Sequence, residues 1–186
     1  MLNRKSPKEG NFNVFPKDKY IHDIMVKLDE FLKIHIEAQI KSGASIIQIF
    51  DSWAGLLQEK DLEHFVYKPI KSLVDFIRQK KVISICFPRN INNYKKFVEN
   101  VNPDIINIDY KVDPSIIRDT IDITVQGGLD PKILLNNKDI LRKEVTKYLK
   151  TFDKKRYIFN LGHGVLPDTN PDMVKYLVSI VRSFNG

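Results

Sequence analysis

The sequence has little cysteine, no long apolar run and no block of basic residues. Cys86 is the single cysteine among 186 residues, which excludes a disulfide framework and a metal site built from several cysteines. No apolar run approaches the roughly 20 residues that a membrane-spanning helix requires. No apolar stretch follows the charged residues at the start, so we expect no secretory signal and a cytoplasmic protein.

The net charge is +7, from 30 Lys and Arg against 23 Asp and Glu. The lysines are spread through stretches with helical spacing, which favours a solvated, lysine-rich surface; an anionic ligand is the alternative. Aromatic and basic residues do not interleave as they do where proteins stack nucleic-acid bases. We therefore expect neither a nucleic-acid partner nor a membrane partner.

Short runs rich in β-branched residues alternate with helical patterns along the chain. Apolar spacing predicts a helix over 18–41, with Gly43 just past its last turn. The runs at 45–50, 82–87, 105–108, 123–125 and 157–159 are predicted strands. Helices are expected at 59–80, 91–101, 114–119, 137–151 and 171–184, the first of them interrupted at Pro69. Continuous apolar strands that alternate with helices predict a parallel sheet.

The pattern predicts an α/β fold with five βα units and parallel strands. A doubly wound sheet and a (β/α)8 barrel both satisfy it. A complete barrel has about 250 residues, so a barrel here would be an incomplete (β/α)8 TIM barrel. In both architectures ligands bind at the carboxyl ends of the strands.

The candidate site residues follow the predicted strands. His163 has glycine on both sides, and its imidazole could donate to a carboxylate; a loop histidine satisfied by backbone is the alternative. The Ser52 hydroxyl could bond a ligand carboxylate or cap the next helix. Asp51 could line the site or only hold its loop. Gln126 and Gly127 begin a predicted tight turn.

Several kinds of site are not expected. Ser52 lacks the G-x-S-x-G setting of a hydrolase nucleophile, and the chain has no dinucleotide or P-loop glycine motif. His22, His35 and His64 fall in predicted helices, so we expect no metal site. Asp113, which precedes Pro114, is predicted to cap a helix.

Three segments resemble motifs of the uroporphyrinogen decarboxylase family. Residues 43–55 (GASIIQIFDSWAG) resemble its central motif, and residues 157–171 (YIFNLGHGVLPDTNP) are similar to its C-terminal motif. Residues 126–131 (QGGLDP) resemble the family's QGNLDP, with Gly128 in place of asparagine. Residues 108–110 stand where the family commonly has Leu-Asp-Trp. The motifs come in the family's order, and the resemblance covers nearly all of residues 17–186.

The resemblance implies that residues 17–186 are the C-terminal part of the family's barrel, strands four to eight, after a loop or severed connection at 1–16. Ser52 and His163 match the family's substrate-binding Ser/Thr and histidine. Neighbours on the active face would be Asp51, Gln126, Gly127 and Gly164. The family's arginine segment, its pyrrole-binding aspartate and its active-site tyrosine have no counterpart, so we assign no catalytic residue.

The implied function is that of a carboxy-lyase, uroporphyrinogen decarboxylase. It converts uroporphyrinogen III to coproporphyrinogen III plus four CO2 in haem and porphyrin biosynthesis, without a cofactor, and the full-length family commonly forms homodimers. The alternative is a non-catalytic half-barrel or decaying gene product. A corrinoid- or zinc-dependent methyltransferase of the same superfamily fits less well, because only Cys86 could serve as a thiolate ligand. An open five-stranded piece would expose edges and apolar surface, so we expect the isolated chain to be aggregation-prone.

Overall fold

A computed structural model describes residues 19–152 and 156–184. The predicted loop at 1–16 lies outside the described residues. The chain divides into two compact units, residues 1–103 and residues 104–186, and each is described by itself.

The first unit places two parallel strands beside helices. Its elements are α1 (Lys19–Lys41), β1 (Ile46–Asp51), η1 (Ala54–Leu56), α2 (Glu59–Leu62), η2 (Glu63–Tyr67), α3 (Lys68–Gln79), β2 (Ile83–Pro88) and α4 (Tyr94–Val101). Strands β1 and β2 pair in parallel, from Ile46 opposite Ile83 to Asp51 opposite Pro88. The carboxyl ends of both strands therefore meet at one edge.

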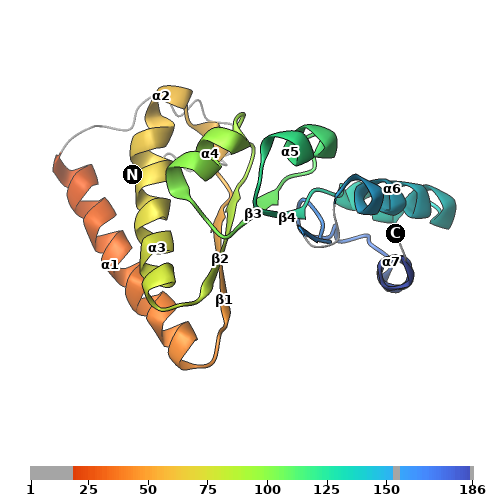
Figure 1. Ribbon diagram of the computed structural model, residues 1–186, viewed down its shortest axis with the longest axis horizontal. Helices are drawn as coiled ribbons and strands as arrows, with labels where there is room; N and C mark the ends of the chain where they lie inside the picture. The colour runs from red at the N-terminus through yellow and green to blue at the C-terminus, as the bar shows by residue number, and fades with distance from the viewer. Residues whose placement is uncertain (1–18, 153–155, 185–186) are drawn as a thin grey trace. The chain divides into compact units, whose positions relative to one another are not determined.

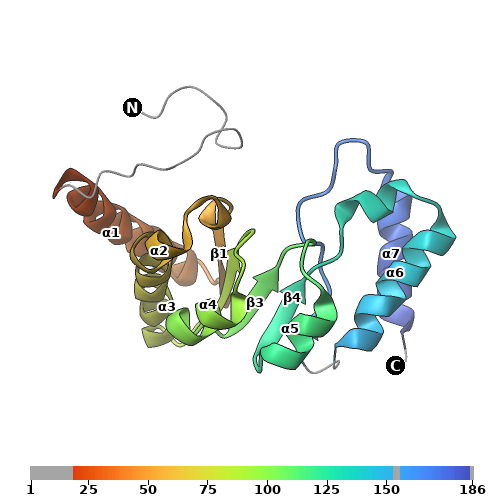
Figure 2. The same cartoon turned by 90° about the horizontal axis from the view of Figure 1, so that it is seen from above.

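Helices α1 and α3 lie on the same side of the β1–β2 pair (Figures 1 and 2). A buried cluster joins them to β1: Ile36 of α1, Ile47 of β1, and Leu73 and Ile77 of α3. This packing follows from the apolar spacing along both helices, which aligns one stripe of each with the strands. The outer side of α1 is different, since Phe31 is 70% exposed and Ile34 is 65% exposed.

The predicted interruption at Pro69 is confirmed. The helical stretch consists of α2, a π-helical turn (η2) and α3, which has proline in its first turn. The N–H of Lys68 bonds the carbonyl of Glu63, five residues earlier. Proline has no N–H to donate to the preceding turn, so the regular α-helical hydrogen bonding is interrupted there.

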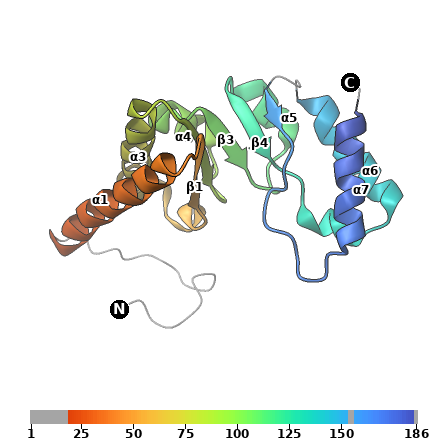
Figure 3. The same cartoon turned by 90° about the horizontal axis from the view of Figure 1, so that it is seen from below.

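The second unit holds three parallel strands. Its elements are β3 (Ile105–Ile108), α5 (Pro114–Thr120), β4 (Thr124–Gly127), η3 (Pro131–Leu135), α6 (Lys138–Thr151), β5 (Tyr157–Ile158) and α7 (Pro171–Ser183). Strand β4 pairs in parallel with β3 and with β5. Helices α6 and α7 lie side by side (Figure 3) and bury Leu141, Val145, Leu177 and Ile180.

Polar caps begin helices α5 and α7 of the second unit, and the sequence predicts the one at Asp113. The Asp113 carboxylate accepts the N–H of Ser115 at 2.8 Å, with Pro114 in the first turn of α5. The Asn170 side chain accepts the N–H of Asp172 at 2.9 Å at the start of α7. These bonds satisfy helix N–H groups that have no partner within the helix.

The predicted fold class is confirmed. Each of the five strands is followed by a helix, and the strands within each unit are parallel, as in part of a (β/α)8 barrel. Strand β3 is buried at all four positions, which is typical of a parallel sheet covered on both faces. In the described part of the chain, no helix combines the length and apolarity needed to cross a membrane.

Candidate active site

The loop after β1 carries Asp51, Ser52 and Trp53. The half-buried Asp51 carboxylate accepts the N–H of Trp53 at 3.2 Å, so the side chain holds its own loop. Burial raises the pKa of Asp51, and hydrogen bonds from the N–H groups of Trp53 and Ala54 partly oppose that rise. The Ser52 side chain is exposed at the end of the strand.

The structure does not support helix capping by Ser52. The residue at the N-cap of η1 is Trp53, and it makes no side-chain capping bond. The N-cap of α2 is Gln58, also without such a bond. The exposed Ser52 hydroxyl is therefore a candidate ligand contact and not a helix cap.

The loops after β1 and β2 are tied together by backbone bonds. The N–H of Arg89 donates to the carbonyl of Asp51 at 3.0 Å, and the N–H of Gly55 donates to the carbonyl of Arg89 at 3.0 Å. A Cβ on Gly55 would lie 2.0 Å from the carbonyl oxygen of Asn90, so no side chain fits there. Glycine at position 55 thus allows the loop that carries Ser52 to pack directly on the loop after β2.

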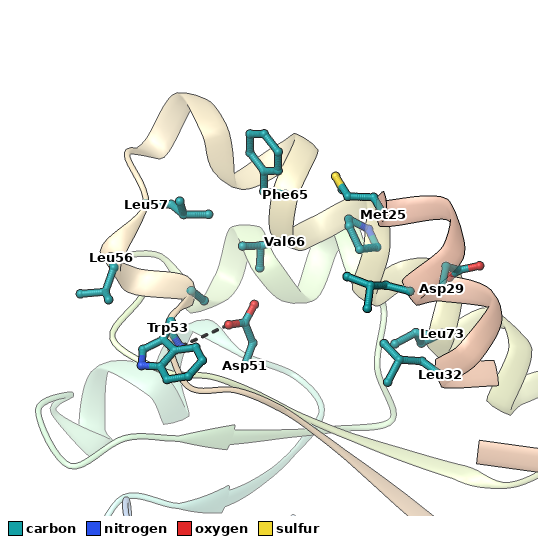
Figure 4. Close-up of a pocket in the computed structure, with 13 residues that line it drawn as sticks. Met25, Asp29, Leu32, Asp51, Trp53, Leu56, Leu57, Phe65, Val66 and Leu73 are labelled. Carbon is teal, nitrogen blue, oxygen red and sulfur yellow. Dashed lines mark hydrogen bonds between the residues drawn. The ribbon is translucent and has the colours of Figure 1, made fainter. Parts of the chain in front are cut away.

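An apolar pocket of about 470 Å³ lies between α1 and the segment after β1 (Figure 4). Met25 and Leu32 of α1 line one side of it, and Trp53 and Phe65 line the other. The Asp51 carboxylate points into this pocket. The apolar walls disfavour its ionised form, which is the physical cause of its raised pKa.

In the second unit, His163 lies in the loop after β5 and is exposed. Its Nδ1 lies 3.4 Å from the carbonyl oxygen of Gly164, a distance too long for a strong hydrogen bond. Gly164 is exposed as well, and a Cβ there would meet nothing within 4 Å. The imidazole is thus exposed to solvent, with one long hydrogen bond to the adjacent backbone.

The segment that leads to His163 is held against two other strand ends. The N–H of Gly162 donates to the carbonyl of Leu129 at 2.8 Å, and Leu161 forms a parallel bridge with Leu129. A Cβ on Gly162 would lie 2.4 Å from the backbone nitrogen of Tyr110. The ends of β3, β4 and β5 therefore converge beside His163, and glycine at position 162 is what permits the close approach.

Gln126 and Gly127 lie in the last part of β4. The buried Gln126 amide donates to the side-chain oxygen of Asn107 at 2.8 Å, so it forms a polar pair with the neighbouring strand β3. Gly127 has φ +89°, and a Cβ there would lie 2.9 Å from the side-chain oxygen of Asn107. The turn with positive φ that the two glycines predict is present at Gly127 and Gly128.

Sequence reasoning missed three side chains that hold this turn. The hydroxyl of Tyr157 donates to the carbonyl of Gly127 at 2.7 Å, and that of Tyr148 donates to the carbonyl of Gly128 at 2.7 Å. Asn107 pairs with Gln126. They lie about 20 to 30 residues from the glycines in sequence, and hydrogen bonds between residues so far apart leave no periodic pattern in the sequence.

The candidate residues thus fall into two groups. Asp51 and Ser52 lie in the first unit, and Gln126, Gly127, His163 and Gly164 lie in the second. Within residues 19–152 and 156–184, no three His, Cys, Asp or Glu side chains gather as a metal site would require. Cys86 is buried in β2.

The family model for uroporphyrinogen decarboxylase (URO-D) matches residues 14–184 of this chain. The chain belongs to the uroporphyrinogen decarboxylase family. The matched range includes Ser52, His163 and the strand ends described above.

Curated uroporphyrinogen decarboxylases of Rickettsia are similar to this family member. The Rickettsia bellii protein is 44% identical over 158 residues, which cover 81% of this chain and 45% of the relative. The Rickettsia felis protein is 37% identical over 177 residues, or 89% of this chain and 51% of the relative. The Rickettsia akari protein is 34% identical, over 94% of this chain and 55% of the relative. The chain spans about half the length of the curated relatives it matches.

Proposed function

We propose that this chain supplies part of a uroporphyrinogen decarboxylase, the carboxy-lyase that converts uroporphyrinogen III to coproporphyrinogen III with release of four CO2 in haem and porphyrin biosynthesis. The observation that carries the proposal is the family match over residues 14–184. The parallel strands support it, because their carboxyl ends carry the candidate contacts Ser52 and His163.

The substrate of this reaction is a polyanion with eight carboxylates. A net charge of +7 favours its approach, since opposite charge raises the local concentration of an ionic ligand. We assign the exposed Ser52 hydroxyl and the exposed His163 imidazole as hydrogen-bond donors to substrate carboxylates. We propose Asp51 as a neighbour of Ser52 in the first unit, and Gln126, Gly127 and Gly164 as neighbours of His163 in the second.

The chemistry asks mainly for positioning. Protonation of a pyrrole carbon allows the C–C bond to the acetate carboxylate to break, so that its electron pair enters the ring and CO2 leaves. Protonation of the resulting methylene and loss of the ring proton give a methyl group. No metal or organic cofactor is needed, and the protein contributes by orienting the substrate and stabilising its charge. We assign no catalytic residue within this chain.

Binding of uroporphyrinogen III to the full 186-residue chain, measured without oxygen, tests the two proposed contacts. A hydrogen bond to a charged group contributes about 1.5–3 kcal/mol, so Ser52→Ala and His163→Gln should each weaken binding roughly ten- to hundredfold. Matched controls are Ser179→Ala and His22→Gln, at exposed helix positions outside the proposed site.

Two results would count against the assignment. If Ser52→Ala binds as tightly as Ser179→Ala, and His163→Gln as tightly as His22→Gln, neither residue is a substrate contact. Absence of any binding by the unmodified chain would favour the alternative, a non-catalytic half-barrel. We further propose a cytoplasmic location and, for the full-length enzyme, a homodimer; gel filtration of the active enzyme tests the second point.

A further inference from the structure

We infer that Tyr148 is a positioning residue for the His163 segment, and that its ring takes the space which a side chain at position 128 would need. The inference rests on the proposed role of His163 as a substrate contact. It concerns residues of the second unit only, and it explains why glycine stands where the family motif has asparagine.

The first observation is the contact between Tyr148 and Gly128. Tyr148 lies on α6 and is only 7% exposed, and its hydroxyl donates to the carbonyl of Gly128 at 2.7 Å. A Cβ on Gly128 would lie 2.7 Å from Cε1 of Tyr148 and 3.1 Å from Cδ1 of Ile108. Position 128 therefore cannot carry a side chain while the tyrosine ring occupies its present place.

The second observation is the backbone route from Gly128 to His163. Leu129 directly follows Gly128, and its carbonyl accepts the N–H of Gly162 at 2.8 Å. Gly162 in turn directly precedes His163. The Tyr148 hydroxyl thus fixes a carbonyl one residue away from the hydrogen bond that holds the His163 segment in place.

The Tyr148 hydroxyl can donate its hydrogen bond to the Gly128 carbonyl at any physiological pH. Burial raises the pKa of Tyr148 to about 12, and the nearby carboxylates of Glu144, Asp113, Asp130 and Asp109 add to that rise. The phenol therefore stays protonated and continues to donate. Tyr157, whose hydroxyl bonds the carbonyl of Gly127, holds the preceding residue in the same way.

Amide hydrogen exchange in the full chain tests the inference without any substrate. Tyr148→Phe keeps the ring and removes only the donor, so the Gly162 amide should exchange roughly three- to tenfold faster, as loss of one hydrogen bond predicts. The Val125 amide, which donates to the carbonyl of Arg156, should keep its rate. The matched control is Tyr176→Phe, because the Tyr176 hydroxyl accepts a hydrogen bond from the Arg142 guanidinium and, among the described residues, bonds no backbone carbonyl.

The outcomes separate a local role from a general one. Faster exchange of Gly162 alone supports the positioning role. If the Gly162 and Val125 amides accelerate equally, Tyr148 only stabilises the unit. If the Gly162 rate is unchanged, Tyr148 does not support the Gly162 hydrogen bond. Either result overturns the inference.

A paired substitution tests the shared space. Gly128→Asn should force the Tyr148 ring aside and accelerate Gly162 exchange, and Gly128→Asn combined with Tyr148→Ala should recover part of the lost protection. Recovery is expected to be partial because φ at position 128 is +102°, which strains any side chain. A double variant no better than Gly128→Asn alone would overturn the claim that the two side chains compete for one space.

Substrate binding provides the second readout. If His163 binds substrate, Tyr148→Phe weakens uroporphyrinogen III binding in the same direction as His163→Gln, and Tyr176→Phe does not. A chain that shows the exchange difference but no substrate binding would refute the proposed function while it upholds the positioning role. A chain that binds substrate but lacks the exchange difference would refute the positioning role while it upholds the proposed function.

Discussion

At the scale of single residues, glycines decide how closely the loops of the candidate site approach one another. Gly55 and Gly162 each stand where a Cβ would overlap the backbone of a neighbouring strand end. Gly164, beside His163, has open space around it. The glycines therefore have two roles. Gly55 and Gly162 permit close loop packing, and Gly164 leaves the candidate ligand contact His163 uncovered.

Asp51 gives a prediction about pH at this scale. Burial raises its pKa above the ordinary value near 3.8, so the folded chain binds this proton more tightly than the unfolded chain. Its contribution to stability is complete below that ordinary value and is lost as pH rises through the folded value. The stability of Asp51→Asn relative to wild type should therefore increase as the pH rises from about 3.8 towards neutral.

Urea denaturation across that range measures the effect. The matched control is Asp168→Asn, at an exposed position of the second unit. If the difference between wild type and Asp51→Asn does not change with pH, or changes as it does for Asp168→Asn, the carboxyl is not in the apolar setting described here.

At the scale of elements, helix α1 has two different faces. Ile36 packs in the buried cluster with Ile77 of α3, whereas Ile34 is 65% exposed. One face of α1 is therefore buried against the rest of the first unit, and the opposite face is exposed. Truncating a side chain of the buried cluster should therefore cost more stability than truncating one on the outer side of α1.

Core substitutions test this division. Ile77→Ala removes a side chain that is 0% exposed and should lower the free energy of unfolding by about 2–5 kcal/mol, since it leaves a cavity. Ile34→Ala, the matched control, should change it by no more than about 0.5 kcal/mol. Equal losses in the two variants, measured by urea denaturation, would show that the outer face of α1 is also buried.

Elements were largely predictable from the sequence, and contacts between distant side chains were not. The strand runs, the interruption at Pro69 and the cap at Asp113 follow from local chemistry. Ser52 and His163 were found as strand-end residues and through the family motifs. The bonds from Tyr148 and Tyr157 to the two glycines left no periodic signal, because they join residues about 20 and 30 positions apart.

At the scale of the whole molecule, the chain combines the family's strand-end motifs with much exposed apolar surface. Phe31, Ile34, Phe50 and Trp53 are each more than half exposed. The chain also spans about half the length of its curated relatives. Exposed apolar side chains favour association between copies of the chain, so aggregation of the isolated chain remains our prediction.

Decarboxylation itself tests the central claim most directly. The chain is mixed with a polypeptide that holds the part of the Rickettsia bellii relative outside the matched region, and conversion of uroporphyrinogen III is followed by chromatography of the oxidised porphyrins. We predict that the mixture forms coproporphyrinogen III, that either polypeptide alone forms little, and that His163→Gln slows the mixture. A mixture that forms no coproporphyrinogen III, while the intact Rickettsia bellii protein does, would contradict the assignment.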